Sequence, residues 1–189
     1  MLIRLAQLAC SLAVPPAKPK TWILTGSLEN FRAGRERDFR VVGMKERRRR
    51  LAEQVTLGDC IAFYVTGVQA FGAITRVVGP LYEDRTRIWP GKPGQADPYP
   101  WRFETEPVIV LDERDFVPAE AVAGELEHAR KWPAEHWRLA FQGQLRSVCE
   151  RDAVLLERVV REAAPGRRSG VNAGATEPVQ VLIGEQSAP

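Results

Sequence analysis

The sequence predicts an α+β protein built on a small mixed β-barrel flanked by helices. Short apolar and β-branched runs, typical of strands, occupy residues 21–24, 61–66, 71–78 and 101–111, with turn residues nearby. Helical segments interrupt these strands irregularly instead of alternating with them, which favours a barrel over a parallel α/β sheet. The composition, 44% hydrophobic and 27% charged, is that of a globular domain.

The elements that follow the first strand are indicated by their end signals. Ser27 is a typical N-cap, and it predicts a short helix over 28–33. A brief extended piece is expected at 41–42. A second helix is predicted over 45–55, ending before the turn at 58–59.

The later elements include a hairpin and two helices. The runs at 61–66 and 71–78 are each bounded by Gly and predict an antiparallel pair. A loop rich in Pro and Gly, residues 81–100, precedes the last long strand. Helices are expected over 118–128 and over 150–162, where apolar side chains recur at helical spacing.

The predicted domain covers residues 20–163. Residues 1–19 form an N-terminal extension that ends in a Pro-rich linker, and residues 164–189 are expected to be a flexible tail. The apolar stretch at 1–14 has some features of a signal peptide, but polar residues interrupt it and no clear cleavage site follows. We favour an upstream extension or a start codon assigned too early. Whether this stretch belongs to the mature protein stays open.

The residues of most enzyme and metal sites are missing from the sequence. Cys10, Cys60 and Cys149 are odd in number and widely spaced, which argues against a disulfide framework and favours a reducing compartment, the cytoplasm. His128 and His136 have no ligand at metal-binding spacing. No nucleotide-loop, nucleophile-elbow or zinc-protease motif occurs, and no segment has transmembrane length. We therefore expect a non-enzyme without cofactor, metal or membrane contact.

Positive charge is concentrated in one stretch of the chain. Residues 32–50 hold nine basic and three acidic residues, twice the whole-chain net charge of +3. Such a patch attracts a polyanion, although an Arg-rich helix face exposed only to water is the alternative. The residues expected to contact phosphates are Arg32, Arg35, Lys45, Arg47 and Arg48.

Five tryptophans supply a second signal. Trp89 and Trp101 lie in or beside the long loop, where flat side chains near basic residues suit base stacking, worth about 1–3 kcal/mol per base. The alternative is that Trp101 caps the core at a strand start and that Trp22 is purely structural. Trp132 and Trp137 are expected to pack the late helices onto the barrel.

The order of several motifs resembles the EVE domain family. Residues 21–30, Thr-Trp-Ile-Leu-Thr-Gly-Ser-Leu-Glu-Asn, are similar to its opening W-I-x(4)-S/R-E-N motif. Residues 57–65 resemble its Gly-Asp strand, residues 71–79 the strand after it, and residues 99–103 its Y-P-x-R motif. Residues 137–148 resemble a late segment of the archaeal and bacterial branch.

This resemblance covers about residues 20–162 and implies a PUA-like barrel related to YTH readers of methylated adenine in RNA. It implies a non-catalytic module that binds RNA or DNA. A modified base, turned out of its stack, would lie in an aromatic pocket between the first strand, the following helix and the long loop. The alternatives are a PUA-like RNA-binding protein without modified-base specificity, and an enzyme or small-molecule binder that takes a free nucleotide.

Carried onto this sequence, the resemblance places Ser27 and Asn30 at the pocket mouth and Thr66 near the position where YTH readers use an Asn. Trp89 and Trp101 would supply cage walls from the loop. Val42 stands where relatives have a cage tryptophan, so this cage would be half-aromatic and would hold a methyl group less tightly. The predicted base pocket consists of Trp22, Ser27, Asn30, Val42, Tyr64, Thr66, Trp89, Trp101 and Arg102.

Overall fold

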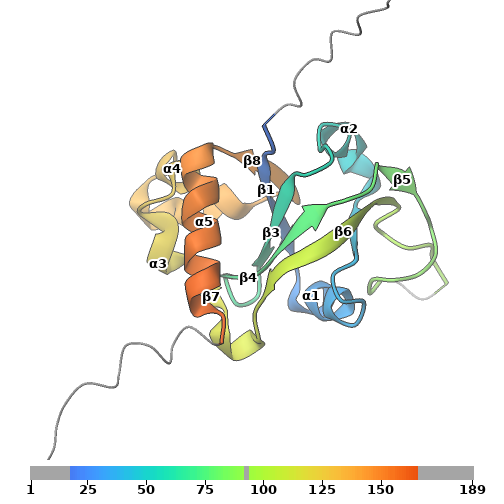
Figure 1. Cartoon of the computed structure of the whole chain (residues 1–189), viewed down its shortest axis with the longest axis horizontal. Coiled ribbons are helices and arrows are strands. Elements are labelled where there is room, and N and C mark those ends of the chain that lie inside the picture. The colour runs from blue at the N-terminus through green and yellow to red at the C-terminus, as the bar shows by residue number, and fades with distance from the viewer. Residues whose placement is uncertain (1–17, 92–93, 166–189) are drawn as a thin grey trace, which may run out of the picture.

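A curled six-strand half-barrel forms the centre of the fold (Figure 1). The structure is a computed structural model that describes residues 18–91 and 94–165. The predicted N-terminal extension and C-terminal tail therefore lie almost entirely outside the described residues, and their character stays a prediction. The mixed α+β architecture with flanking helices confirms the predicted fold class.

The strands follow the order β2-β6-β4-β3-β1-β8 across the sheet. β1 runs parallel to β3, whereas the other neighbouring pairs are antiparallel. Two short strands lie off this path, β5 against β6 and β7 against β4. The strands are β1 Thr21–Gly26, β2 Val41–Met44, β3 Cys60–Val65, β4 Ala70–Val77, β5 Tyr82–Glu83, β6 Trp101–Val110, β7 Val117–Pro118 and β8 Leu145–Val148.

The first helix and the last helix are as the sequence predicts. The Ser27 side chain accepts a hydrogen bond from the Asn30 N–H and caps α1, and the C-terminal helix α5 follows β8 directly. The helices are α1 Leu28–Arg35, α2 Arg49–Ala52, α3 Glu120–Ala123, α4 Glu127–Arg130 and α5 Glu150–Ala163, with 3₁₀ turns η1 Glu46–Arg48, η2 Glu113–Asp115 and η3 Ala134–Phe141.

Two predicted helices are each broken into two pieces. The 45–55 segment consists of η1 followed by the short α2, and the 118–128 segment divides into α3 and α4. Gly124 ends α3, and the chain is extended at Leu126 before α4 begins. The buried Asp152 carboxylate on α5 accepts the N–H groups of Glu127 and His128, both at 2.8 Å. The carboxylate thus caps the start of α4 from another helix, and the local sequence does not encode this start.

Alternation along β1 separates two cores. Trp22 and Leu24 point into the half-barrel, whereas Ile23 faces the helices on the outer side. The Trp22 indole is 1% exposed, and its N–H donates to Asp59 at 2.8 Å. Trp22 is therefore a core residue, in agreement with the structural alternative. The inner core also includes Met44, Ile61, Val77, Phe103 and Leu145.

The outer core lies between the sheet and the late helices, with α5 crossing one side of the sheet beside α3 and α4 (Figure 1). Trp137 is buried there, as predicted. Trp132 is 42% exposed, so the prediction that it packs the late helices onto the barrel is wrong. Its backbone N–H donates to the Ala129 carbonyl after α4, and its ring lies outside the outer core.

Candidate functional site

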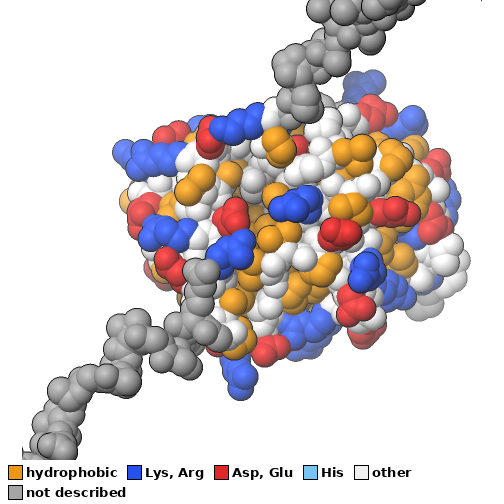
Figure 2. Space-filling model, in the orientation of Figure 1, with side chains coloured by type: hydrophobic (Ala, Val, Ile, Leu, Met, Phe, Trp, Pro, Cys, Tyr) orange, Lys and Arg blue, Asp and Glu red, His pale blue; other side chains and the backbone are white. Residues whose placement is uncertain are grey.

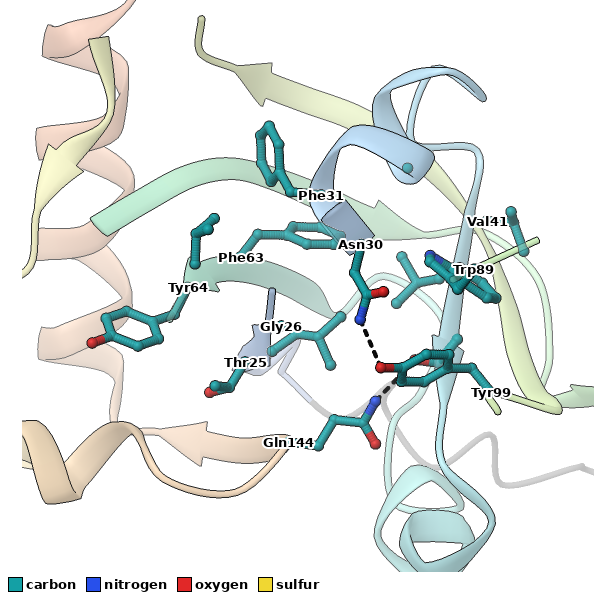
Figure 3. Close-up of a pocket in the computed structure, with 15 residues that line it drawn as sticks. Thr25, Gly26, Asn30, Phe31, Val41, Phe63, Tyr64, Trp89, Tyr99 and Gln144 are labelled. Atoms are coloured by element: carbon teal, nitrogen blue, oxygen red, sulfur yellow. Dashed lines mark hydrogen bonds between the residues drawn. The ribbon is translucent and has the colours of Figure 1, made fainter. Parts of the chain in front are cut away.

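A small apolar chamber lies at one end of the half-barrel, between β1, α1, β2 and β3 (Figure 3). It has a volume of about 40 Å³, and a single water molecule needs roughly 10–15 Å³ by the same measure. The apolar side chains that line it come from five elements or loops and include Leu24, Phe31, Val42, Phe63, Val65 and Trp89. The chamber therefore has room for a group of very few atoms.

Two aromatic residues of the long loop form one wall of the chamber. Trp89 and Tyr99 meet edge to face, with ring centroids 5.4 Å apart. The Trp89 ring lies directly on Gly43 of β2, where an added Cβ would stand 2.4 Å from the indole Cζ3. Only glycine fits beneath this ring, so Gly43 sets the position of the wall.

The loop that carries this wall is held by a buried polar network. The Asp97 carboxylate accepts the N–H groups of Ile88, Trp89 and Tyr99 at 2.6, 2.9 and 2.7 Å. The guanidinium of Arg102, which is fully buried, contacts the Asp84 carboxylate and lies 3.6 Å from the Asp97 carboxylate. Charge-assisted hydrogen bonds of this kind are stronger than bonds between neutral groups, so they hold the loop at both Trp89 and Tyr99, the two residues of the chamber wall.

The doorway of the chamber, formed by Asn30, Tyr99 and Gln144, is polar. The Asn30 amide donates to the Tyr99 hydroxyl at 2.6 Å, and both side chains are drawn facing each other in Figure 3. Gln144, just before β8, lies beside them. Its side-chain amide donates to the Gly43 carbonyl at 3.4 Å and accepts a hydrogen bond from the Lys45 N–H at 2.8 Å. Its backbone carbonyl accepts a hydrogen bond from the Thr25 N–H. Gln144 therefore links β2 to the β1–β8 edge, the two sides of the half-barrel that no strand pairing joins.

An open bowl of about 360 Å³ lies outside the doorway. It shares Asn30, Tyr99 and Gln144 with the chamber, so the two spaces adjoin at the doorway. The Lys45 ammonium stands over the Tyr99 ring at 5.6 Å from its centroid. The other side chains around the bowl are mostly polar and include Ser27, Glu29, Arg47 and Thr66.

The structure brings five of the predicted pocket residues together. Val42 and Trp89 line the chamber, Ser27 and Thr66 line the bowl, and Asn30 lines both. The Thr66 hydroxyl donates to the Gly26 carbonyl at 3.2 Å, which holds this side chain against β1.

Four other predicted pocket residues lie elsewhere. Trp22 is in the inner core, and Arg102 lies behind the chamber wall, fully buried. The Trp101 ring packs in the inner core, where its N–H donates to Glu46 at 3.1 Å and the Arg49 guanidinium covers it at 4.3 Å. Tyr64 borders the chamber, but its ring points away (Figure 3) and stacks on Phe141 in the outer core, which raises the pKa of its hydroxyl through burial.

The predicted phosphate contacts divide in the same way. Lys45 and Arg47 line the bowl. Arg32 instead forms a two-point pair with Glu113 at 2.7 Å, and Arg35 pairs with Asp112 at 3.1 Å. The hydrogen bond and charge of Glu113 raise the pKa of Arg32, and the Arg32 hydrogen bond lowers the pKa of Glu113. The face where α5 lies carries interspersed acidic and basic side chains (Figure 2), not a field of one sign.

Three site residues were not assigned from the sequence. Tyr99 is part of the Y-P-x-R motif, and its position in that motif is the signal that could have found it. Gly43 follows Val42, but its role depends on Trp89, which lies 46 positions later in the numbering. Gln144 has no local signal, because its side-chain hydrogen-bond partners, Gly43 in β2 and Lys45 just after it, are about 100 residues earlier.

Within residues 18–91 and 94–165, no three His, Cys, Asp or Glu side chains group closely enough to hold a metal ion. In the same part of the chain, no helix has the length and apolar character that a membrane crossing requires.

The half-barrel and its flanking helices form a PUA-like fold. The chain belongs to the EVE domain family, whose sequence profile matches residues 20–146. A comparison with curated proteins gives no significant match.

Solved YTH domains share the fold at low sequence identity. The YTH domain of Zygosaccharomyces rouxii MRB1, solved in complex with N6-methyladenosine RNA, is 17% identical with a TM-score of 0.54, over 76% of this chain and 88% of that one. The Pho92 YTH domain, solved with m6A, is 14% identical with a TM-score of 0.55, over 76% and 84%. Human THYN1, solved with 5-methylcytosine DNA, is 14% identical with a TM-score of 0.48, over 74% and 97%.

Proposed function

We propose that this protein is a non-catalytic nucleic-acid-binding module that recognises an extruded base carrying a small exocyclic substituent. The ring of the base lies in the bowl, and its substituent passes the doorway into the chamber. The observation that carries the proposal is the difference in size and polarity between these two adjoining spaces.

The sizes separate the two parts of the ligand. The bowl, at about 360 Å³, falls in the range of small-molecule sites, roughly 300–1,000 Å³. The chamber, at about 40 Å³, takes a methyl or hydroxymethyl group but not a ring. A base without a substituent leaves the chamber unfilled, so the substituent adds affinity by burying its apolar surface.

The side chains around the doorway suit a planar heterocycle. Tyr99 offers a ring face beside Lys45, and Asn30 and Gln144 bring amide groups to the edge of a base. Trp89 supplies the aromatic part of the chamber wall, and Val42 supplies an aliphatic part, which makes a half-aromatic enclosure. A methyl group in this enclosure gains apolar contact, about 0.8 kcal/mol, or roughly a fourfold gain in affinity.

The relatives with the same fold support this ligand class. The MRB1 and Pho92 YTH domains were solved with N6-methyladenosine. The proposal covers RNA and DNA strands alike. The free thiols of Cys60 and Cys149 fit the cytoplasm as its compartment.

The test is a set of short strands of one sequence, each with a single modified base or none, titrated against the protein. Wild type should bind one modified strand at least about fourfold more tightly than the plain strand. Val42→Ile adds one methylene next to the chamber and should reduce that ratio toward one, while affinity for the plain strand stays within about twofold. Val160→Ile, a buried position in the outer core, is the matched control and should keep the wild-type ratio.

Equal affinities for all strands in wild type would refute modified-base recognition. With a steep salt dependence, that result would instead indicate a PUA-like RNA-binding protein that reads no modification. Salt-independent binding of a mononucleotide would indicate a small-molecule binder.

A further inference from the structure

Two arginines converge beside the turn that precedes β8. Gly143 in this turn has a φ of +90°, and Arg48 at the end of η1 and Arg146 in β8 both extend over it. A methyl group built on Gly143 would stand 3.1 Å from Arg48 Nη2 and 3.3 Å from Arg146 Nη2. The two guanidinium groups therefore border the same small volume.

No acidic side chain of the described residues neutralises this pair. Arg49 pairs with Glu53, and Arg85 pairs with Glu46 and Glu83, so neighbouring arginines do have carboxylate partners. Arg146 instead donates its Nε–H to the Gln142 carbonyl at 2.9 Å, which fixes the plane of its guanidinium. The Arg48 Nε–H is buried and has no hydrogen-bond partner. Two like charges close together without a counter-ion, one with an unsatisfied donor, are costly in a folded protein.

The pair lies at the edge of the bowl. Gly143 and Gln144 line the bowl, as do Lys45 and Arg47 from the segment that contains Arg48. Gln144 separates the pair from the chamber and holds β2 beside the β8 edge. An anion at Gly143 is therefore placed next to any ring that occupies the bowl.

We propose that Arg48 and Arg146 form an anion-binding site for one phosphodiester of the bound strand, at or next to the nucleotide whose base enters the bowl. The ligand class follows from the donors, because two planar guanidinium forks match phosphate oxygens better than they match a single chloride ion. The identity of the ligand as a nucleic acid rests on the proposed function. Arg146 lies far in sequence from the basic stretch at residues 32–50 and was not among the predicted phosphate contacts.

The test measures affinity for the plain strand and for a modified strand at several salt concentrations. Arg48→Gln and Arg146→Gln should each weaken the binding of both strands by the same factor and should lower the salt slope, by about one for each lost phosphate contact. The ratio between the two strands should not change, since the chamber is untouched. Arg146→Lys should recover part of the affinity. Arg158→Gln on α5 removes the same charge beside Glu125 and is the control.

If Arg48→Gln and Arg146→Gln match Arg158→Gln in affinity and salt slope, the anion site is refuted. Failure of modified-base recognition gives a different result: both strands bind equally to wild type, while Arg146→Gln still lowers the slope. Melting temperatures of all variants establish that they are folded.

A wild type that binds no strand would refute the proposed function, and inorganic phosphate then tests the anion site alone. The Nε–H resonances of Arg48 and Arg146 should shift as phosphate is added, and the Arg158 resonance should not. The absence of any shift at Arg48 and Arg146 would overturn the assignment.

Discussion

Asp97→Asn is the substitution that most directly tests how the chamber wall is held in place. One Asp97 carboxylate oxygen accepts the Ile88 and Trp89 N–H groups, and the other accepts the Tyr99 N–H. An asparagine keeps the shape but has only one acceptor oxygen, so its NH₂ group must face at least one backbone donor. It also removes a negative charge 3.6 Å from the buried Arg102 guanidinium.

The expected cost is worked from these two losses. One charge-assisted hydrogen bond and part of a buried ion pair together contribute about 3 kcal/mol. The ion pair is lost only in part because Arg102 keeps its contact with Asp84. For a domain of this size the melting temperature should fall by roughly 6–12 °C. Trp89 should become more accessible, and the ratio between modified and plain strands should decrease, because the wall no longer has a fixed position.

The assay combines thermal unfolding with acrylamide quenching of tryptophan fluorescence, with Trp89→Phe as the reference that identifies the Trp89 signal. Asp38→Asn is the matched control, because Asp38 is exposed and has a φ of 51°, which asparagine also adopts. It should change stability by less than about 0.5 kcal/mol. A melting temperature for Asp97→Asn equal to that of Asp38→Asn would refute the anchoring role of the network.

Three further predictions concern charge, pH and thiol reactivity. Arg47→Gln, on the bowl, should weaken strand binding and lower its salt slope, whereas Arg32→Gln, whose side chain is paired with Glu113, should leave both unchanged in the same titrations; equal losses would mean that the bowl is not the phosphate side. Hydrogen bonds from the backbone and side chain of Thr86, with Arg102 adding to them, lower the pKa of Asp84, so its contribution to stability is complete above the ordinary carboxyl pKa of 3.8 and is lost as the pH falls through the lower folded-state pKa. The melting-temperature difference between wild type and Asp84→Asn should therefore stay constant from about pH 8 to 5 and shrink only in stronger acid, and a difference that shrinks near neutral pH would contradict this. Burial raises the pKa of the Cys60 thiol, so in a Cys10→Ser background iodoacetamide at neutral pH should label the exposed Cys149 first by mass spectrometry, and faster labelling of Cys60 would show that its strand is open.

The sequence was sufficient to predict the barrel because its strands are short continuous apolar runs with clear ends. The Ser27 cap and the hairpin of β3 and β4 are encoded within a few residues, and the structure confirms both. The prediction of one helix over 118–128 failed for the opposite reason. The second half of this segment begins where the Asp152 carboxylate on α5 caps it, and the sequence around Glu127 does not indicate that distant contact.

The site was predicted only in part, because the pattern does not say which way a ring points. Trp89 and Trp101 are both aromatic and both belong to the long loop or its end, yet Trp89 lines the chamber and Trp101 packs in the inner core. Strand alternation and pairing with β2 decide the direction of Trp101. Arg32 and Arg47 look alike in the basic stretch, but only the fold brings Glu113 beside Arg32.

The measurement that tests the central claim most directly is a methyl NMR titration of the chamber itself. Val42 and Val65 line the chamber and are 1% exposed, so their methyl resonances report on what enters it. A strand with the recognised modified base should shift both sets of resonances, and the plain strand should shift signals around the bowl only. Identical methyl shifts with both strands, or none with any modified strand that binds, would contradict the division of the base between bowl and chamber.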